Sequence, residues 1–470
     1  MRADKMEAVR EGQSSNVSRR TLLKWGAAGT VASVGGWIGW GLVDEANEQS
    51  SPRAMQPRPA DNLAAAFGVV THLHFREAAY GQSERVVEQL ADLGVRHIRN
   101  RLAAMPPVRA AFVQLSANGT RVQGVCGAFG DPQTMRQVMD EVTKSYDDPI
   151  AVFSAFEGIN EPNNNGVPWV GETRAKTKDL FEERHSHGLD EITIVGPALA
   201  RVSAGGVEGA DTQAQSAMLG DLTPWIEQGN IHVYPRAQTA SADLDEFIAW
   251  QRQVCGDKPI YNTEGGFFTA INYRGGSHPA SEDAVRQYAP RLVMESWIRG
   301  IPRFFLYELL DDPDESNSHR ESNFGMVKLS GLRTGDAWTP KPHYVAMKNF
   351  LTILSDPGPI HTLSALIYGI EDAGPEVRTT LVQKRDGSHY LCLWRDVAVY
   401  DPASRESIAV APRTLRVTLK HAAVVAEYRP ATQAMPVATH SQVRSFPVSM
   451  AGELHICKIS TPVTTATAPR

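Results

Sequence analysis

The sequence predicts an α/β protein, a (β/α)8 TIM barrel followed by a C-terminal all-β sandwich domain. Between residues 61 and 355, eight apolar runs typical of strands alternate with helical stretches. Beyond residue 356, short strand-like runs follow one another without helices. Parallel strands need helical crossovers, so eight such units fit a closed barrel. An open doubly wound sheet is the alternative, disfavoured because no glycine-rich phosphate loop follows the first run.

The eight predicted barrel strands are residues 67–75, 95–102, 121–129, 151–159, 192–199, 230–235, 258–263 and 303–310. After the first strand, Ser83 marks a helix start, and Val86, Val87, Leu90 and Leu93 share its apolar face. After the third strand, Asp131-Pro132 predicts another helix start, through a cap followed by a proline in the first turn.

Residues 379–394 predict a hairpin around Arg385-Asp386-Gly387, and residues 413–419, 422–428 and 454–459 continue the short-strand pattern. We therefore expect three parts: residues 1–60 as signal and linker, 61–355 as barrel, and 356–470 as β-domain and tail. Cys392 and Cys457 fall in strands of the β-domain, and their spacing leaves a disulfide open.

The N-terminal sixty residues predict export. Arg19 and Arg20 precede an uncharged, glycine-rich run over residues 25–43, the pattern of a twin-arginine signal peptide. The expected partner is the twin-arginine export machinery, and the expected location is periplasmic or extracellular, with no stable membrane span after processing. No clear cleavage site follows, so an uncleaved anchor is the alternative. Residues 51–60 contain three prolines, which predicts a linker.

Composition excludes several classes of protein. The formal net charge is −6 and the pI is about 6.2, which argues against a nucleic-acid partner. The four cysteines contain no CxxC pair, so a zinc knuckle or a thioredoxin-type site is not expected. We expect no cofactor and no metal.

Charged and aromatic residues follow the predicted barrel strands at the end where barrels carry their active sites. Glu161 follows strand 4 and Glu264 follows strand 7. Strand 6 carries His232 and Tyr234, and strand 2 carries Arg99. Two glutamates at one barrel face form a candidate pair for glycosidic bond cleavage, which needs one protonated and one ionised carboxyl group.

Further candidates for substrate contacts are Asn160 beside Glu161, His74 on strand 1 and Tyr307 on strand 8. Trp169 could stack on a sugar face, although core packing is the alternative for this residue. Glu157 is expected to point into the barrel or its rim and to form a structural ion pair with an arginine rather than to take part in catalysis.

The segments Asn160-Glu161-Pro162 and Asn262-Thr263-Glu264 resemble those of the retaining glycoside hydrolases with a (β/α)8 barrel, such as families 39 and 5. The resemblance implies that Glu161 is the acid/base and Glu264 the nucleophile. It departs from some of these families at strand 8, where a Trp is common and this chain has Tyr307.

The same resemblance implies supporting roles. Tyr234 and Arg99 would hold the carboxylate of Glu264, His232 would line the site, and Asn160 would bind the sugar 2-hydroxyl. The two catalytic carboxyl groups are expected to lie about 5–5.5 Å apart, the separation of retaining enzymes. The expected substrate is a poly- or oligosaccharide, and the mild acidity of the chain favours a neutral or weakly charged one.

Three alternative functions remain open at this stage. The barrel could bind carbohydrate without cleaving it, or it could transfer the sugar to an acceptor other than water. A metal-dependent amidohydrolase-like barrel is a further alternative, since His72-x-His74 ends strand 1. Amidohydrolase barrels also need a histidine after strand 5, and residues 192–199 contain none.

Overall fold

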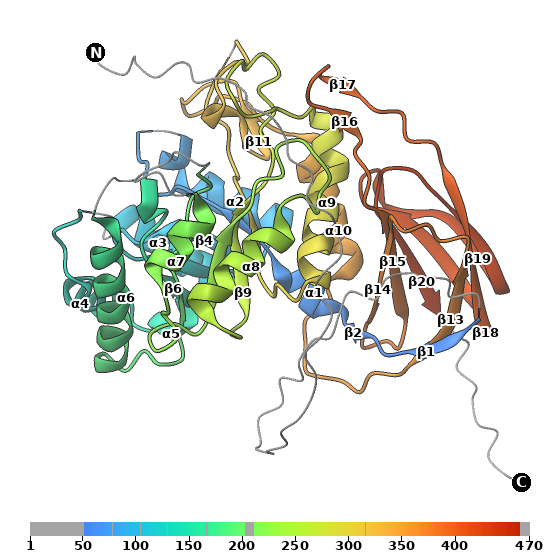
Figure 1. Ribbon diagram of the computed structural model, residues 1–470, viewed down its shortest axis with the longest axis horizontal. Coiled ribbons are helices and arrows are strands. Elements are labelled where there is room, and N and C mark those ends of the chain that lie inside the picture. Colours follow the sequence, from blue (N-terminus) through green and yellow to red (C-terminus); the bar gives the residue numbers. More distant parts are fainter. Residues whose placement is uncertain are drawn as a thin grey trace, which may run out of the picture. The chain divides into compact units, whose positions relative to one another are not determined.

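The computed structural model describes residues 51–77, 79–103, 105–128, 130–164, 168–202, 211–314 and 316–460. The predicted twin-arginine signal lies outside the described residues. The described chain forms a (β/α)8 barrel and a C-terminal β-sandwich, as the sequence predicts (Figure 1). None of the helices in these ranges has the length and hydropathy that a membrane crossing requires.

The barrel is built from eight parallel strands. Along the sheet the order is β7-β6-β5-β4-β3-β10-β9-β8, and a parallel bridge between Val195 and Gln228 joins the two ends, which closes the barrel. Each predicted run overlaps one strand. The strands are β3 (Phe67–Val70), β4 (His97–Arg101), β5 (Arg121–Val125), β6 (Phe153–Glu157), β7 (Thr193–Val195), β8 (Gly229–His232), β9 (Ile260–Gly265) and β10 (Phe304–Leu306).

Helices surround the barrel, and each connects consecutive strands or follows the last one (Figure 1). They are α2 (Ser83–Leu93), α3 (Pro106–Ala117), α4 (Met135–Ser145), α5 (Pro149–Val152), α6 (Trp169–Ser186), α7 (Thr212–Leu219), α8 (Leu244–Cys255), α9 (Glu282–Ile298) and α10 (Pro342–Leu354). The four apolar residues predicted to share one face of α2 are all buried.

Two predicted boundaries are wrong. Helix α4 begins at Met135 rather than at Asp131, because Thr134 and Gln137 form a capping box that satisfies the first free N–H groups. The predicted fourth strand starts too early, since residues 149–152 form the short helix α5. The side chain of Asp148 caps this helix, and Pro149 occupies its first turn.

The β-domain is organised around one long bent hairpin, β18 (Arg413–Arg429) and β19 (Gln433–Met450). The first part of β18 pairs with β13 (Leu366–Glu371), and its last part pairs with β20 (His455–Ser460). The β18–β19 register breaks between Thr418 and Ala423, where the strand passes from one layer to the other. Strands β14 (Val377–Gln383) and β15 (His389–Arg395) extend the second layer, and the apolar core lies between the layers.

Residues 51–60 are part of this β-domain, so the prediction of a linker is wrong. Strand β1 (Arg53–Met55) pairs antiparallel with β13, and β2 (Arg58–Pro59) pairs parallel with β14, before α1 (Ala60–Ala66) leads into the barrel. Both strands lie at the ends of the sheet order, where a strand can tolerate proline because one edge needs no partner. The β-domain is thus assembled from segments on both sides of the barrel sequence.

Strand β15 is buried on both faces and connects the two domains. Leu391 packs in the sandwich core, whereas Cys392 and Trp394 pack against the barrel helices. The indole N–H of Trp394 donates to Glu295 of α9 at 2.6 Å. Cys457 pairs with Leu391 and therefore faces the sandwich core, on the side of the sheet opposite to Cys392. The disulfide left open by the sequence is absent, and both thiols are free.

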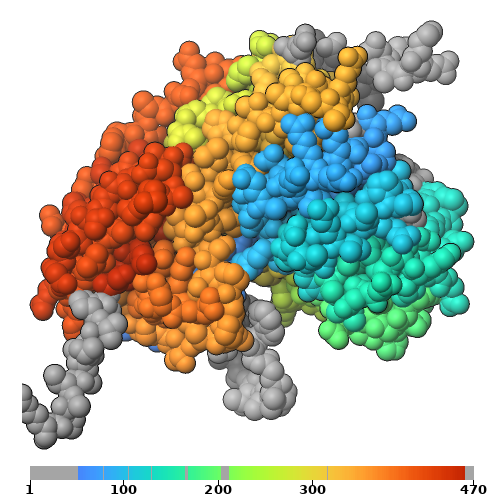
Figure 2. All heavy atoms as spheres, turned by 180° about the vertical axis from the view of Figure 1, so that it is seen from behind, coloured from blue at the N-terminus to red at the C-terminus, as the bar shows by residue number. Residues whose placement is uncertain are grey.

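Helix α10 also contacts the β-domain. The side-chain amide of Asn349 donates to the carbonyl of Pro430, in the turn between β18 and β19, at 2.8 Å. Figure 2 shows this orange part of the chain between the blue start of the barrel and the red β-strands.

A small hairpin of the β-domain, β16 (Tyr400–Asp401) and β17 (Glu406–Ser407), reaches the loop that follows β9. Arg405 lies in its turn with φ 61° and donates to the carbonyls of Ile271 and Tyr273 at 2.5 and 2.6 Å. The backbone N–H of Val399, next to this hairpin, donates to the hydroxyl of Tyr288 at 2.9 Å. The loop after β9 is therefore held by contacts from the second domain.

Candidate active site

Two adjoining cavities open where the barrel strands end. The larger has a volume of about 560 Å³ and the smaller about 400 Å³. Both are lined by Glu161 and Glu264, together with His72, Asn160 and Asn164. The two carboxylates that the sequence singles out therefore lie between the cavities, where a ligand occupying both would pass over them.

Glu161 follows β6 in a left-handed backbone conformation, with φ 41°. Its Oε1 lies 2.8 Å from Nδ1 of His232, and its Oε2 accepts a hydrogen bond from the side-chain amide of Asn164 at 2.9 Å. Pro162 begins the short 3-10 helix η2 (Pro162–Asn164) directly after it. The side chain of Glu161 is 23% exposed, so this carboxyl group can reach a ligand in either cavity.

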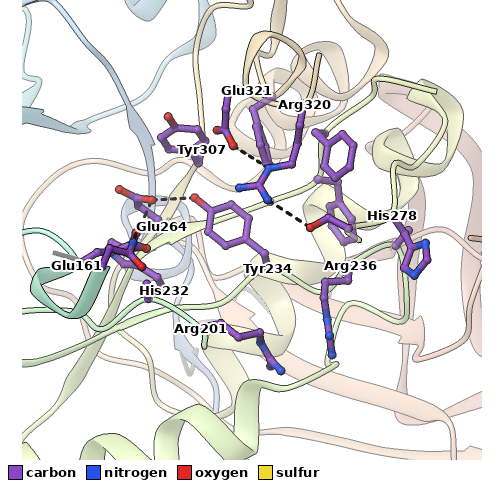
Figure 3. A pocket seen from close by; sticks show the side chains of 18 of the residues that line it. Glu161, Arg201, His232, Tyr234, Arg236, Glu264, His278, Tyr307, Arg320 and Glu321 are labelled. Atoms are coloured by element: carbon purple, nitrogen blue, oxygen red, sulfur yellow. Dashed lines mark hydrogen bonds and ion pairs between the residues drawn. The ribbon is translucent and has the colours of Figure 1, made fainter. Parts of the chain in front are cut away.

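Glu264 lies near the end of β9, and its side chain is 10% exposed. Its Oε1 accepts a hydrogen bond from Nη1 of Arg99 at 2.5 Å. Its Oε2 accepts one from the hydroxyl of Tyr234 at 2.8 Å, as Figure 3 shows. An oxygen of Glu161 lies within 4.8 Å of an oxygen of Glu264. A cation and a hydroxyl donor thus hold the carboxyl group of Glu264 in position.

Arg99 is 3% exposed and connects the site to the barrel interior. Its Nε and Nη2 donate to the two oxygens of Glu157 at 2.7 and 2.8 Å, and Glu157 also accepts from Gln123 at 2.7 Å. The predicted ion pair of Glu157 with an arginine is confirmed. Burial alone would lower the pKa of Arg99, but the two carboxylates Glu157 and Glu264 raise it. The guanidinium is therefore a permanent and rigidly held cation.

Asn160 also contacts this guanidinium. Its Oδ1 accepts from Nη2 of Arg99 at 2.7 Å, so the amide can offer its NH2 group to a ligand. The side chain lines both cavities, which places a neutral donor beside the two carboxylates.

His232 links Glu161 to the core. Its Nε2 lies 3.0 Å from Oγ1 of Thr263, whose hydroxyl donates to Asn230 at 2.8 Å. Because that hydroxyl proton is already used, Nε2 of His232 must carry a hydrogen and donate to Thr263. The Nδ1 atom, which faces Glu161, is then the one that gains or loses a proton.

The proton shared by this pair lies on the histidine. Burial lowers the pKa of His232, but the nearby charges of Glu264 and Glu161 raise it above its ordinary value of 6.5. Burial raises the pKa of Glu161, but the hydrogen bond and charge of His232 lower it below 4.5. The pair shares one proton, which leaves only as the pH rises through the raised pKa of His232.

We expect His232→Gln to move the alkaline limb of the pH profile of kcat/KM toward lower pH by at least about one unit. In the wild type, the proton needed for acid catalysis stays on the pair until the raised pKa of His232 is passed. In the variant, Glu161 must hold that proton alone, and its ordinary pKa is 4.5. The measurement is kcat/KM between about pH 4 and pH 9, the range where Glu and His titrate.

The matched control for this experiment is His185→Gln, because His185 is 75% exposed and pairs only with Asp190 on the outer surface. Its pH profile should coincide with that of the wild type. An alkaline limb that stays in place in His232→Gln would contradict the shared-proton assignment.

Of the other residues predicted to contact the substrate, Tyr307 and His74 line a cavity and Trp169 does not. Tyr307 lines the larger cavity, with its ring 5.3 Å from that of Phe324. His74 lines the smaller cavity, and burial lowers the pKa of His74 to about 4, so its ring is neutral. The prediction that Trp169 contacts substrate is wrong, because its side chain is fully buried in the barrel core and lines neither cavity. Trp169 is the first residue of α6, and sequence periodicity near a helix start does not define which side chains are buried.

Several residues of the larger cavity are not predicted by the sequence, namely Arg201, Arg236, His278 and Arg320. They lie in irregular segments after strands, where no periodicity predicts which side chains point inward. Glu308, which the sequence places at the end of the eighth strand, is 7% exposed, accepts a hydrogen bond from the hydroxyl of Tyr80 at 2.8 Å and lies 3.4 Å from His72. Burial raises the pKa of Glu308 well above its ordinary value.

One group in the described part of the chain has the spacing of a metal site, and it consists of Glu161, His232 and Glu264. The Arg99 cation already occupies one oxygen of Glu264, which disfavours a second cation there. His72 and His74 find no third ligand among the described residues, so the amidohydrolase alternative gains no support.

Comparisons with known proteins identify the fold. The sequence matches no family model and no curated protein. Among solved structures, a glucosidase from Croceicoccus marinus has 11% identity and a TM-score of 0.57, covering 87% of this chain and 98% of its own. A GH39 enzyme from Xanthomonas axonopodis pv. citri has 12% identity and a TM-score of 0.52, covering 86% and 95%.

A monomeric beta-xylosidase from Caulobacter crescentus has 12% identity and a TM-score of 0.52, covering 87% of this chain and 98% of its own. These similarities extend over the barrel and the β-domain together, because they cover most of both chains. The protein therefore shares its fold with these three structures over most of its length.

Proposed function

We propose that this protein is an exported retaining glycosidase that hydrolyses an O-glycosidic bond of a poly- or oligosaccharide by double displacement. The observation that carries the proposal is the pair Glu161 and Glu264, two carboxyl groups within 4.8 Å in unequal environments between two cavities. Such a distance supports the retaining geometry, in which the carboxyl groups are about 5–5.5 Å apart, over the wider inverting one. The twin arginines of the N-terminal segment support export.

In the first step, Glu264 is the nucleophile. Arg99 and Tyr234 orient its carboxylate, and one oxygen attacks the anomeric carbon. The bond from that carbon to the leaving oxygen breaks, and Glu161 gives its proton to the leaving oxygen. The proton reaches Glu161 from Nδ1 of His232, 2.8 Å away. The products are the free leaving alcohol and a glycosyl ester on Glu264.

In the second step, the ester is hydrolysed. Glu264 has lost its negative charge, which removes one of the charges that raise the pKa of His232. Glu161 is then ionised and takes a proton from water, while the water oxygen attacks the anomeric carbon and releases Glu264. The NH2 group of Asn160 is placed to donate to the sugar 2-hydroxyl, a hydrogen bond that strengthens in the transition state.

The same residues also support transfer to a sugar acceptor, because only the second-step nucleophile differs. The test of the proposal is a panel of aryl glycosides and oligosaccharides, with the anomer of the first-formed product followed by NMR. We expect cleavage with retention, and Glu161→Gln should abolish cleavage of oligosaccharides. Glu88→Gln, an exposed carboxylate on α2, is the matched control and should behave as wild type.

Two results would contradict the proposal. An inverted first product would exclude double displacement. Full cleavage by Glu161→Gln and Glu264→Gln, or no cleavage of any glycoside by the wild type, would remove the catalytic assignment and favour a carbohydrate-binding barrel.

A further inference from the structure

The larger cavity has a basic end that the proposed reaction does not use. Arg201, Arg236 and Arg320 all line it, together with the catalytic carboxylates. In Figure 3, Arg201 and Arg236 lie on one side of Tyr234, and Arg320 lies on the other. Three guanidinium groups around a single cavity of about 560 Å³ are more than glycosidic bond cleavage requires.

Two of the three arginines share one close carboxylate partner. Nη2 of Arg201 lies 2.7 Å from Oδ2 of Asp243, and Nη2 of Arg236 lies 3.4 Å from the same oxygen. The single carboxylate of Asp243 is thus shared by two guanidinium groups at ion-pair distance. Glu246, exposed on the first turn of α8, attracts Arg201 more weakly. On the opposite wall, Arg320 is balanced by Glu321 at 2.7 Å.

The backbone around Arg236 and Asp243 keeps the guanidinium groups of Arg201 and Arg236 at the cavity wall. Arg236 and Ala237 both have left-handed conformations after β8, with φ 52° and 60°. Such conformations cost free energy in residues other than glycine and persist only where the surroundings enforce them. Asp243, with φ 68°, occupies the N-cap position of α8 but makes no side-chain capping bond. Its carboxylate pairs with Arg201 and Arg236 instead of capping the helix.

Arg201 also contacts the aromatic ring of Phe247. Its guanidinium lies 4.7 Å from the ring centre of Phe247, a buried residue of α8. Stacking on an aromatic ring fixes the plane of the guanidinium while its edge stays free for oxyanion contacts. The side chain remains 31% exposed, so a ligand can reach it.

We propose that this basic end of the larger cavity binds an anionic substituent of the glycan, a carboxylate or a sulfate ester, through Arg201 and Arg236. A guanidinium fork matches the paired oxygens of such groups, and a neutral sugar needs no net positive charge. The local cluster opposes the formal charge of −6 on the whole chain, from which a neutral substrate is expected. This inference rests on the proposed glycosidase activity and specifies its substrate class.

The test uses matched pairs of glycans that differ only in charge. Glucuronoxylan and homogalacturonan oligosaccharides are compared with their carboxyl-reduced forms, and sulfated galactan oligosaccharides with their desulfated forms. For each pair, both calorimetric binding and kcat/KM are measured at low and high salt. We expect at least one charged member to exceed its neutral partner by about tenfold or more, and this preference to shrink with salt.

Arg236→Gln and Arg201→Gln should each reduce the ratio of kcat/KM between charged and neutral partners by about tenfold. Arg333→Gln, an exposed arginine that does not line the cavity, should leave the ratio unchanged. The carboxylate and sulfate pairs distinguish which oxyanion is recognised.

The outcomes separate the inference from the proposed function. Equal binding and cleavage of charged and neutral partners would overturn the inference while leaving the glycosidase intact. An unchanged ratio in both arginine variants would also overturn it. Charge-selective binding without cleavage of any glycan would support the anion site and contradict the proposed hydrolysis.

Discussion

Glu264→Ala is expected to lower kcat by at least about 10⁴-fold, because the variant has no group that can form the glycosyl ester. Each tenfold loss corresponds to about 1.4 kcal/mol of activation free energy, so the expected loss is about 5.5 kcal/mol. The measurement is kcat on the best aryl glycoside found in the panel. Glu88→Gln on the outer surface of α2 serves as the control with wild-type rate.

Azide distinguishes the two carboxylates in this experiment. In Glu264→Ala, azide fits the space of the lost carboxylate and should restore activity by forming a glycosyl azide of inverted anomer. In Glu161→Ala, azide should attack the ester on Glu264 and give the retained anomer. Exchanged stereochemistry between the two variants would mean that the assigned roles of Glu161 and Glu264 are reversed.

Arg99→Met is expected to destabilise the protein by about 3–5 kcal/mol and to lower kcat/KM by about 10²–10³-fold. The substitution leaves Glu157, which is fully buried, without its bidentate cation. It also leaves Glu264 without its closest charge partner. Urea unfolding monitored by fluorescence gives the loss of stability, and steady-state kinetics gives the loss of activity.

The double variant Arg99→Met/Glu157→Gln separates the two effects. Removing the unpaired buried charge of Glu157 should recover much of the lost stability, because the desolvation cost disappears. Activity should not recover, since Glu264 still lacks its cation. Recovery of both quantities together would mean that Arg99 acts on Glu264 only by holding the barrel together.

The sequence predicted the barrel well because the information is periodic and local. Each of the eight apolar runs overlaps a parallel strand. The side chains at or near the carboxyl ends of β4, β6, β8 and β9 converge because these ends share one face of the barrel. Arg99, Glu161, His232, Tyr234 and Glu264 could therefore be grouped from their positions relative to the strands.

The features that the sequence does not predict depend on contacts between residues that are far apart in the chain. The strand pairing of residues 53–59 is decided by partners more than three hundred residues away, so the three prolines were misleading. The basic end of the larger cavity depends on the left-handed residues Arg236 and Ala237 after β8. It also depends on Asp243, which occupies the N-cap position of α8 but pairs with two arginines. Trp169 became a core residue because α6 begins at that position, a boundary that the sequence pattern does not define.

The hairpin that carries Arg405 connects the β-domain to a loop of the barrel that lines the larger cavity. Its guanidinium holds the carbonyls of Ile271 and Tyr273, and the same loop contributes Phe268 and His278 to the larger cavity. The β-domain is thus not an interchangeable appendage, and excision or exchange of this domain alters a wall of the substrate cavity. Divergence of the hairpin offers a route by which specificity could drift while the two carboxylates stay untouched.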